Sequence, residues 1–236
     1  MSNVEAFIFD VFGTVVDWRT SVARFSTDMF SKKRIEIDGL AFADYWRSQY
    51  VPAMARIRSG DRGYVPLDEL HFENLEATLA NFDLQSVLSE EEKWHLNSAW
   101  EHLDPWPDVV SGLTQLKQNA IIAPCSNGSI ALMTRLARYG GLPWDCILGA
   151  DIARNYKPEH GVYLACCSAL RLAPEQVAMV AAHNDDLVAA RDAGLKTAFI
   201  ARATEYGENQ SRDFKATSDW DWIISDFAEL TSPPAR

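Results

Sequence analysis

Side chains that could do chemistry stand where short apolar runs of the sequence stop or shortly beyond them. They are Asp10, the pair Ser126 and Asn127, Lys157, and the cluster His-Asn-Asp-Asp at residues 183–186. A carboxylate can attack an electrophilic carbon or accept a proton, and a nearby cation keeps it ionised. A fold that brings these positions together would therefore combine a carboxylate nucleophile with a cation, a hydroxyl, an amide and further carboxylates.

The apolar runs themselves predict a buried parallel sheet. They lack the alternation of polar and apolar residues, as expected of strands that are covered on both faces. Stretches with apolar residues on one helical face separate them. The predicted strands are residues 5–10, 120–125, 177–182 and 197–200, and the predicted helices are residues 108–117, 130–139, 161–170 and 187–193. This alternation indicates a doubly wound α/β fold, in which the carboxyl ends of the strands meet at one crevice.

The stretch from residue 16 to residue 100 differs, because it holds no convincing buried strand. Phe42, Tyr45 and Trp46 share one face of a predicted helix, and Pro52 is expected to kink or restart that helix. Inserted directly after the first strand, such helices would lie over the carboxyl ends of the sheet, where ligands bind. The predicted organisation is a core domain of residues 1–15 and 101–236 with a helical cap domain of residues 16–100.

The amino-acid composition disfavours some classes of binding partner. The 236 residues include 22 Lys and Arg against 33 Asp and Glu, a formal net charge of −11, which disfavours binding to a nucleic-acid backbone. No apolar run reaches the ~18 residues of a membrane span. The N-terminus lacks the basic start of a signal peptide. The four cysteines form no CxxC pair, so free thiols in a reducing cytoplasm are expected.

Four segments resemble, in order, the motifs of the haloacid dehalogenase superfamily. They are residues 7–14 (FIFDVFGT), 125–128 (CSNG), 156–158 (YKP) and 180–194, which contains the acidic cluster. The resemblance spans nearly the whole chain and implies a Rossmann-like core with a helical cap after the first strand. It also implies that Asp10 is the nucleophile. Without the resemblance, Asp10 could simply cap the turn after its strand.

One position separates the branches of this superfamily. Its phosphatases carry a second aspartate two residues after the nucleophile, which protonates the leaving oxygen and helps to hold Mg²⁺; here that position is Phe12. A halide leaving group needs no proton, so Phe12 favours the L-2-haloacid dehalogenases. That resemblance implies hydrolysis of (S)-2-haloalkanoic acids to (R)-2-hydroxy acids through an ester on Asp10, with no metal or organic cofactor. The configuration inverts because the carbon is attacked once.

The resemblance assigns substrate contacts around the first and second segments. Thr14 would support the nucleophile, although a threonine there could also cap a helix. Ser126 would bind the substrate carboxylate and Asn127 the departing halide, whereas both could be ordinary turn residues. Val11 and Phe12 would lie against the substrate.

The remaining catalytic positions come from the later segments and from the cap. Lys157 would keep the nucleophile ionised, and Asp186 would orient Lys157 and the hydrolytic water. Arg47, in a Trp-Arg pair of the cap, would take up the halide, because guanidinium suits a large soft anion in a dry pocket. Tyr163 would lie near the site. The competing interpretations are solvated charges for Lys157 and Arg47, a helix-capping acid for Asp186 and a core position for Tyr163.

Departures from the family pattern concentrate in the fourth segment. Asp185 stands where an aromatic residue is common, and His183 where many members have asparagine. Asn184, between them, is a further candidate for substrate binding. For His183 two interpretations stay open: a neutral imidazole in the core, or a role beside the site, as a base or as support for the catalytic groups.

Two other functions also stay open. One is a Mg²⁺-dependent phosphatase of the same superfamily, which Phe12 disfavours. The other is a non-catalytic relative that binds small anions, which the retention of Asp10, Lys157 and Asp186 disfavours. The expected partners are a small 2-haloacid substrate and a second copy of the chain in a homodimer. Neither a nucleic acid nor a membrane is expected.

Overall fold

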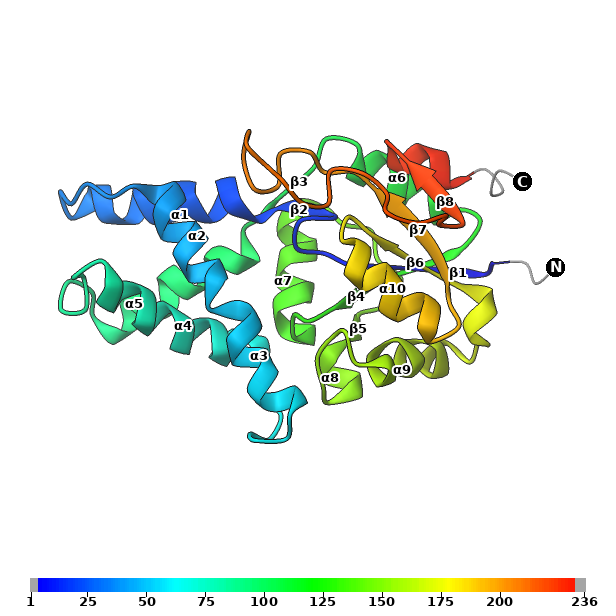
Figure 1. Ribbon diagram of the computed structural model, residues 1–236. Helices are drawn as coiled ribbons and strands as arrows, with labels where there is room; N and C mark the ends of the chain where they lie inside the picture. Colours follow the sequence, from blue (N-terminus) through cyan, green and yellow to red (C-terminus); the bar gives the residue numbers. More distant parts are fainter. Residues whose placement is uncertain (1–3, 232–236) are drawn as a thin grey trace.

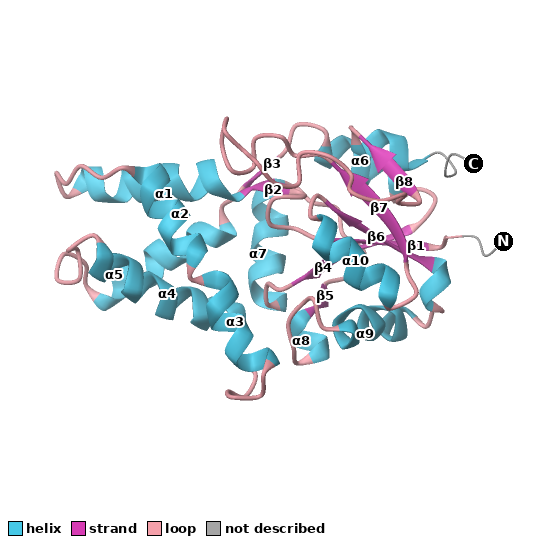
Figure 2. Ribbon diagram, in the orientation of Figure 1, coloured by secondary structure: helices cyan, strands magenta, loops and turns pink. Residues whose placement is uncertain are grey.

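A six-stranded parallel sheet forms the centre of the computed structural model, which describes residues 4–231 (Figures 1 and 2). The strands follow the order β5-β4-β1-β6-β7-β8 across the sheet. Their bounds are β1 Ala6–Phe9, β4 Ile121–Ser126, β5 Leu148–Gly149, β6 Val177–Ala181, β7 Lys196–Ile200 and β8 Trp222–Ile224. Neighbouring strands pair in parallel throughout the sheet. The predicted α/β fold is therefore confirmed.

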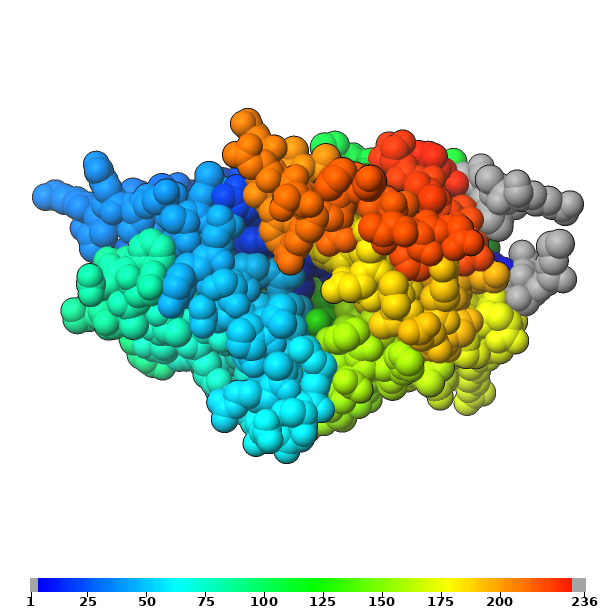
Figure 3. All heavy atoms as spheres, viewed as in Figure 1, coloured from blue at the N-terminus to red at the C-terminus, as the bar shows by residue number. Residues whose placement is uncertain are grey.

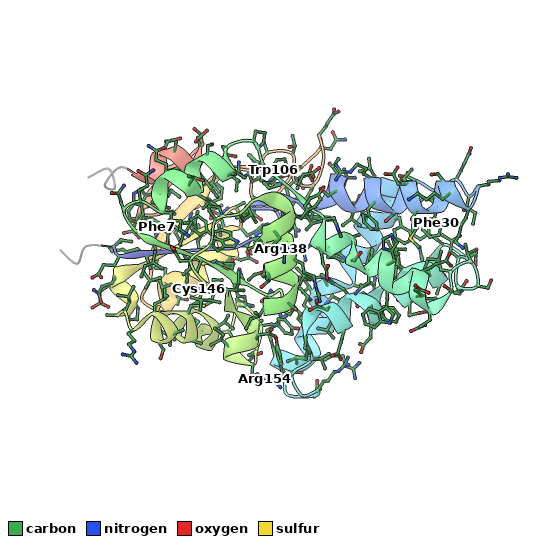
Figure 4. The ribbon with its side chains drawn as sticks, turned by 180° about the vertical axis from the view of Figure 1, so that it is seen from behind. Phe7, Phe30, Trp106, Arg138, Cys146 and Arg154 are labelled. Atoms are coloured by element: carbon green, nitrogen blue, oxygen red, sulfur yellow. The ribbon has the colours of Figure 1, made fainter. Side chains whose placement is uncertain are left out.

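Strand β1 lies inside the sheet because both of its faces are apolar and buried. Phe7 and Phe9 belong to one apolar cluster and Ala6 and Ile8 to the other, as the two-residue period of a strand requires. Helices α6 (Val109–Leu116) and α7 (Ile130–Gly140) cover the first face, and α9 (His160–Leu170) and α10 (Asn184–Asp192) cover the second. Figure 4 views the molecule from behind relative to Figure 1, so that the first face is toward the viewer, and it labels Phe7.

Five helices lie together beside one end of the sheet (Figure 1). They are α1 Trp18–Lys32, α2 Gly39–Ser48, α3 Tyr50–Arg58, α4 Leu67–Asn81 and α5 Glu90–Asn97. Side-chain caps start three of them: Asp17 for α1, Asp38 for α2 and Ser89 for α5. Pro52 falls in the first turn of α3, where a missing N–H does no harm, so the helix restarts as predicted.

A short antiparallel ribbon closes this helical segment at its base. β2 (Val16–Asp17) pairs with β3 (Asp104–Pro105), so the chain leaves and re-enters the core at one place. Further along, the end of α3 and the loop after it contact the core directly. Arg58 Nη1 donates to the carbonyl oxygen of Lys157 at 3.2 Å, and Tyr64 Oη donates to Asp151 Oδ1 at 2.5 Å. Asp151 is the second residue of the short helix α8 (Ala150–Ala153).

The helix of the fourth segment begins earlier than predicted. It starts at Asn184, not at residue 187, because Asp185 and Asp186 occupy its first turn, where acids interact favourably with the helix dipole. These polar side chains obscured the apolar period on which the prediction rested. Among the described residues, no helix is both long and apolar enough to cross a membrane, and the four cysteines are free thiols.

Candidate active site

A cavity of about 210 Å³ lies between the ends of the sheet strands and helices α2 and α3. Figure 3 shows the surface hollowed on this side, between the cyan helices and the yellow-to-orange segments that follow β6 and β7. Asp10 reaches the cavity from the end of β1, Asn127 from the end of β4 and His183 from the end of β6. The strand order reverses between β1 and β6, and open α/β sheets bind ligands at such a point.

The Asp10 carboxylate is buried and held by three donors. Lys157 Nζ lies 2.9 Å from its Oδ1. Thr14 Oγ1 donates to its Oδ2 at 2.7 Å, and His183 Nδ1 lies 3.0 Å from the same oxygen. Burial favours the neutral acid, but the charges of Lys157 and His183 outweigh it and lower the pKa of Asp10 far below its usual value. Asp10 is therefore ionised, as a nucleophile must be.

Lys157 lies buried between two carboxylates. Its Nζ donates to Asp10 Oδ1 and to Asp186 Oδ2, while Tyr163 Oη donates to the other oxygen of Asp186. Burial would lower the pKa of Lys157, but the two carboxylates raise it well above its usual value. For Asp186, burial raises the pKa in spite of Lys157. The backbone N–H of Lys157 also donates to Asn127 Oδ1 at 2.8 Å, which fixes both residues.

His183 stands between Asp10 and a second carboxylate, that of Glu205. Its Nε2 lies 2.9 Å from Glu205 Oε2, on the side opposite to Asp10. Burial would lower the pKa of His183, but Glu205 and Asp10 raise it well above its usual value. The interpretation of His183 as a neutral core imidazole therefore does not fit the structure.

Arg47 reaches the cavity from helix α2. Its guanidinium carbon lies 3.8 Å from the centre of the Tyr50 ring and 5.4 Å from that of Trp18. Within residues 4–231, Arg47 Nη1 is buried and has no hydrogen-bond partner. A buried cationic donor without an acceptor is costly, and an anion in the cavity would satisfy it.

Comparison with known proteins places the chain in a family. The model for haloacid dehalogenase-like hydrolases matches residues 4–194. The chain belongs to this family. Two solved structures of L-2-haloacid dehalogenases, one of them described as defluorinating, are each 45% identical to it. The defluorinating enzyme has a TM-score of 0.95, with 97% of this chain and 94% of that chain covered; the other has a TM-score of 0.92, with 97% of each covered.

A curated relative with a more distant sequence is also named as a 2-haloacid dehalogenase. An (S)-2-haloacid dehalogenase of Pseudomonas sp. (strain YL) is 27% identical over 224 residues, which cover 94% of this chain and 91% of that protein. The resemblance drawn from the four segments to the haloacid dehalogenases is thus confirmed over the length of the chain.

This hydrolase brings together most of the predicted site residues. Those that line the cavity or bond directly to a residue that lines it are Asp10, Phe12, Thr14, Arg47, Asn127, Lys157, Tyr163, His183, Asn184 and Asp186. Both interpretations of Tyr163 hold, since it is fully buried and also bonds to Asp186. Thr14 does not cap a helix, because Asp17 caps α1; its hydroxyl instead accepts from the N–H of Ala182 at 2.9 Å.

Three predicted substrate contacts lie outside the cavity lining. Val11 and Ser126 are fully buried, and Ser126 Oγ accepts from the N–H of Gly128 at 3.0 Å. The Asn184 side chain faces the segment after β7, donating to Asp213 Oδ1 at 2.9 Å. In this hydrolase, Asn184 holds the loop that covers one side of the cavity.

Sequence analysis missed Glu205, which contacts His183, and also the cavity-lining residues Tyr50, Met54 and Tyr206. Glu205 is 1% exposed, and Trp18 Nε1 donates to its Oε1 at 3.0 Å. No motif marks it. The one available signal was its position shortly after the predicted strand at residues 197–200, because the carboxyl ends of parallel strands share one edge of the sheet.

Proposed function

We propose that this hydrolase converts (S)-2-haloalkanoic acids to (R)-2-hydroxy acids through an ester on Asp10. The observation that carries the proposal is a buried, ionised carboxylate at the bottom of a small cavity, with Phe12 in the position of the phosphatase acid. A carboxylate is a modest nucleophile, so exclusion of water and alignment with the carbon–halogen bond matter greatly. The names of the two 45% identical relatives support the substrate class.

The proposed roles follow from the charges around the cavity. Asp10 attacks the substrate carbon, and Lys157 keeps Asp10 ionised and balances the substrate charge. Arg47, whose Nη1 lacks an acceptor among the described side chains, takes up the halide, with Asn127 beside it. Phe12 offers neither a proton nor a metal ligand, which disfavours the Mg²⁺-dependent phosphatase. The carboxylates of Asp10 and Asp186 are both engaged by the Lys157 ammonium, so they do not present a vacant cation site.

The proposal extends to organisation and location. We propose that residues 16–100 act as a cap that covers the substrate and that residues 1–15 and 101–236 form the catalytic core. Ser126 is proposed to meet the substrate carboxylate once the substrate is bound. A cytoplasmic location fits the free cysteines, and a homodimer, expected from the family, is testable by light scattering.

A halide-release panel tests the substrate class. The substrates are chloroacetate, fluoroacetate and the two enantiomers of 2-chloropropionate, each with EDTA present. The expected result is release of halide from the (S) enantiomer and not from the (R) enantiomer, with (R)-lactate as the product. Phosphate release from phosphate esters with Mg²⁺ runs in parallel. Phosphatase activity without halide release would reject the proposal.

Single turnover in ¹⁸O-labelled water tests the covalent step. With enzyme in excess over substrate, the label is expected in Asp10 and not in the hydroxy acid, because water attacks the carboxyl carbon of the ester. The product oxygen then comes from the original carboxylate. Label in the first-turnover product would instead indicate direct attack of water on the substrate, with Asp10 as a base.

A further inference from the structure

Both ring nitrogens of His183 face carboxylate oxygens. Nδ1 lies 3.0 Å from Asp10 Oδ2, and Nε2 lies 2.9 Å from Glu205 Oε2. An ionised carboxylate only accepts hydrogen bonds, so each nitrogen must carry a hydrogen for both contacts to be favourable. With both carboxylates ionised, this geometry corresponds to an imidazolium. Such a ring donates two hydrogen bonds and has no lone pair with which to act as a base.

Glu205 is fixed in the position that keeps this charge in place. Trp18 Nε1 donates to its Oε1, and the carboxylate lies directly against Gly13, where an added Cβ would come within 2.1 Å of Oε1. The start of its loop is anchored by Arg202, whose Nε donates to the carbonyl oxygen of Thr14 at 2.9 Å. These contacts hold the Glu205 carboxylate in place beside His183.

The two oxygens of Asp10 are not equivalent. Oδ2 accepts from Thr14 Oγ1 and contacts His183 Nδ1, which occupies both of its lone pairs. Oδ1 accepts only from Lys157 Nζ among the described residues, so one lone pair remains. Oδ1 is accordingly the nucleophilic oxygen, and Oδ2 becomes the carbonyl oxygen of the ester.

We propose that the His183 imidazolium, held by Glu205, is a catalytic electrophile: with Thr14 it forms the oxyanion hole for Asp10 Oδ2 during hydrolysis of the ester. The inference rests on the proposed function, since it concerns the second step of that reaction. It assigns to His183 a part in breaking the ester, not in forming it.

During hydrolysis of the ester, one proton of the attacking water passes through Asp186 and Lys157 to the product. Water attacks the carboxyl carbon of Asp10 and gives a proton to Asp186, and the carbonyl electron pair moves onto Oδ2, where His183 and Thr14 donate to it. When the tetrahedral intermediate collapses, the bond between the carboxyl carbon and Oδ1 breaks. Oδ1 leaves with the product and takes a proton from Lys157, which regains one from Asp186. The second proton of the water stays on the new oxygen of the Asp10 carboxyl and is released to solvent, because Lys157 and His183 favour the ionised form of Asp10. Burial, which raises the pKa of Asp186, suits it to accept the proton from water.

The other charged groups near the imidazolium do not replace Glu205. Lys157, Arg47 and Arg212 are cations that line the same cavity. The carboxylates of Asp185 and Asp213 also line it, but they accept hydrogen bonds from the N–H of Asp186 and from the Asn184 amide. Tyr206, next to Glu205 on the loop after β7, has a raised pKa, because burial opposes its ionisation, and it stays neutral. Once Asp10 is esterified, Glu205 is the anion in contact with His183 that sustains its charge.

The pH dependence of ester hydrolysis in Glu205→Gln tests the inference. After rapid mixing with (S)-2-chloropropionate, decay of the ester adduct is followed by mass spectrometry. In the wild-type enzyme the rate should hold into the alkaline range. Glu205→Gln returns the histidine towards its ordinary pKa of about 6.5, so hydrolysis should fall as the pH rises through neutrality and recover near pH ~6. The matched control Glu208→Gln removes an exposed charge from the same loop and should keep the wild-type profile.

A histidine that acts as a base predicts the opposite result. Hydrolysis would then rise with pH through the histidine pKa, and Glu205→Gln would accelerate it at neutral pH. Either that result or an unchanged profile would overturn the inference.

Two replacements of His183 give a second test that does not depend on Glu205 variants. His183→Leu removes the donor, so first-turnover halide release should persist while ester hydrolysis falls about 10²–10³-fold and the adduct accumulates. His183→Asn places an amide N–H near the position of Nδ1, without charge, and should recover part of that loss. Equal hydrolysis in all three proteins would refute the role of His183. Absence of halide release from the wild-type enzyme would instead refute the proposed function.

Discussion

The Asp10 carboxylate sits among charges of both signs, and their balance explains how it stays reactive while buried. Lys157 and His183 each lie within 3.0 Å of one of its oxygens, and each of these cations has a second carboxylate, Asp186 or Glu205. An unpaired buried charge would be strongly destabilising, whereas this alternating series compensates each group. The arrangement lets an anion, the substrate, enter next to an ionised nucleophile.

Replacement of Asp10 tests the nucleophile most directly. Asp10→Asn is nearly isosteric, but a neutral amide cannot form the ester, so turnover should be lost while the far-UV circular dichroism stays that of the folded protein. The measurement is steady-state halide release from (S)-2-chloropropionate. Activity above a tenth of the wild-type value would remove Asp10 from this role.

Replacement of Arg47 tests whether its charge acts in catalysis or its side chain only packs against neighbouring rings. Among the described residues of helices α1 to α5, Arg47 is the cation that has a buried donor without an acceptor. Arg47→Ala should therefore lower halide release by at least about 10²-fold, the cost of losing one preorganised donor. Arg56→Ala, on the exposed side of the neighbouring helix α3, is the matched control and should leave the rate unchanged. Equal rates in both variants would leave Arg47 with a packing role only.

The turn after β1 links the first motif to the loop after β7. Gly13 has φ +92°, a conformation that side chains rarely adopt, and its missing Cβ makes room for the Glu205 carboxylate. The glycine of the first motif is thus required twice, by its own backbone and by a residue far away in the sequence. The turn after β1 and the loop after β7 are far apart in the sequence, and the contact between Gly13 and Glu205 couples them.

A pair of glycine variants separates these two requirements. Gly13→Ala should lower the free energy of unfolding by about 1–3 kcal/mol through backbone strain and should also displace Glu205, slowing ester hydrolysis. Gly60→Ala is matched in backbone, with φ +82°, but an added Cβ there meets nothing within 4 Å. It should show the stability loss in urea unfolding without the kinetic loss. Identical kinetics in the two variants would contradict the coupling.

At the scale of the whole molecule, surface ion pairs set the response to acid. Hydrogen bonds from Arg62 lower the pKa of Glu73, and those from Arg24 lower the pKa of Asp104. A carboxyl whose pKa is lower in the folded protein adds stability above its unfolded value of about 4, and that stability is lost as the pH falls through the folded pKa. The protein should therefore lose stability as the pH drops below about 4.

Urea unfolding at several pH values measures this loss. The midpoint should be nearly constant from neutral pH down to about pH 5 and should then fall steadily. Arg62→Ala should reduce the difference between neutral and acidic pH, because Glu73 then titrates alike in both states. An Arg62→Ala slope as steep as that of the wild-type protein would show that this pair does not contribute.

The sequence alone determined strands β1, β4, β6 and β7, the helical insertion and the positions of Asp10 and Asp186 after their strands. Strands β5 and β8 were not predicted, and Lys157 follows the short helix α8 and not a strand. The predicted features follow from local rules: a buried strand must be continuously apolar, and chemistry-bearing residues in a doubly wound fold collect at strand ends. Phe12 likewise indicated the type of leaving group through its own side chain. Where local polarity masked the pattern, as at the start of α10, the predicted boundary was wrong.

Only the tertiary structure decided what surrounds those residues. The contact from Trp18 to Glu205 joins positions 187 residues apart, and no periodicity or spacing could have revealed it. The directions of Ser126 and Asn184 were equally hidden, because each side chain is oriented by partners brought near by folding. The charge of His183 is the clearest case: an imidazole has an ordinary pKa near neutrality, and the two carboxylates that set its protonation come from separate strand ends.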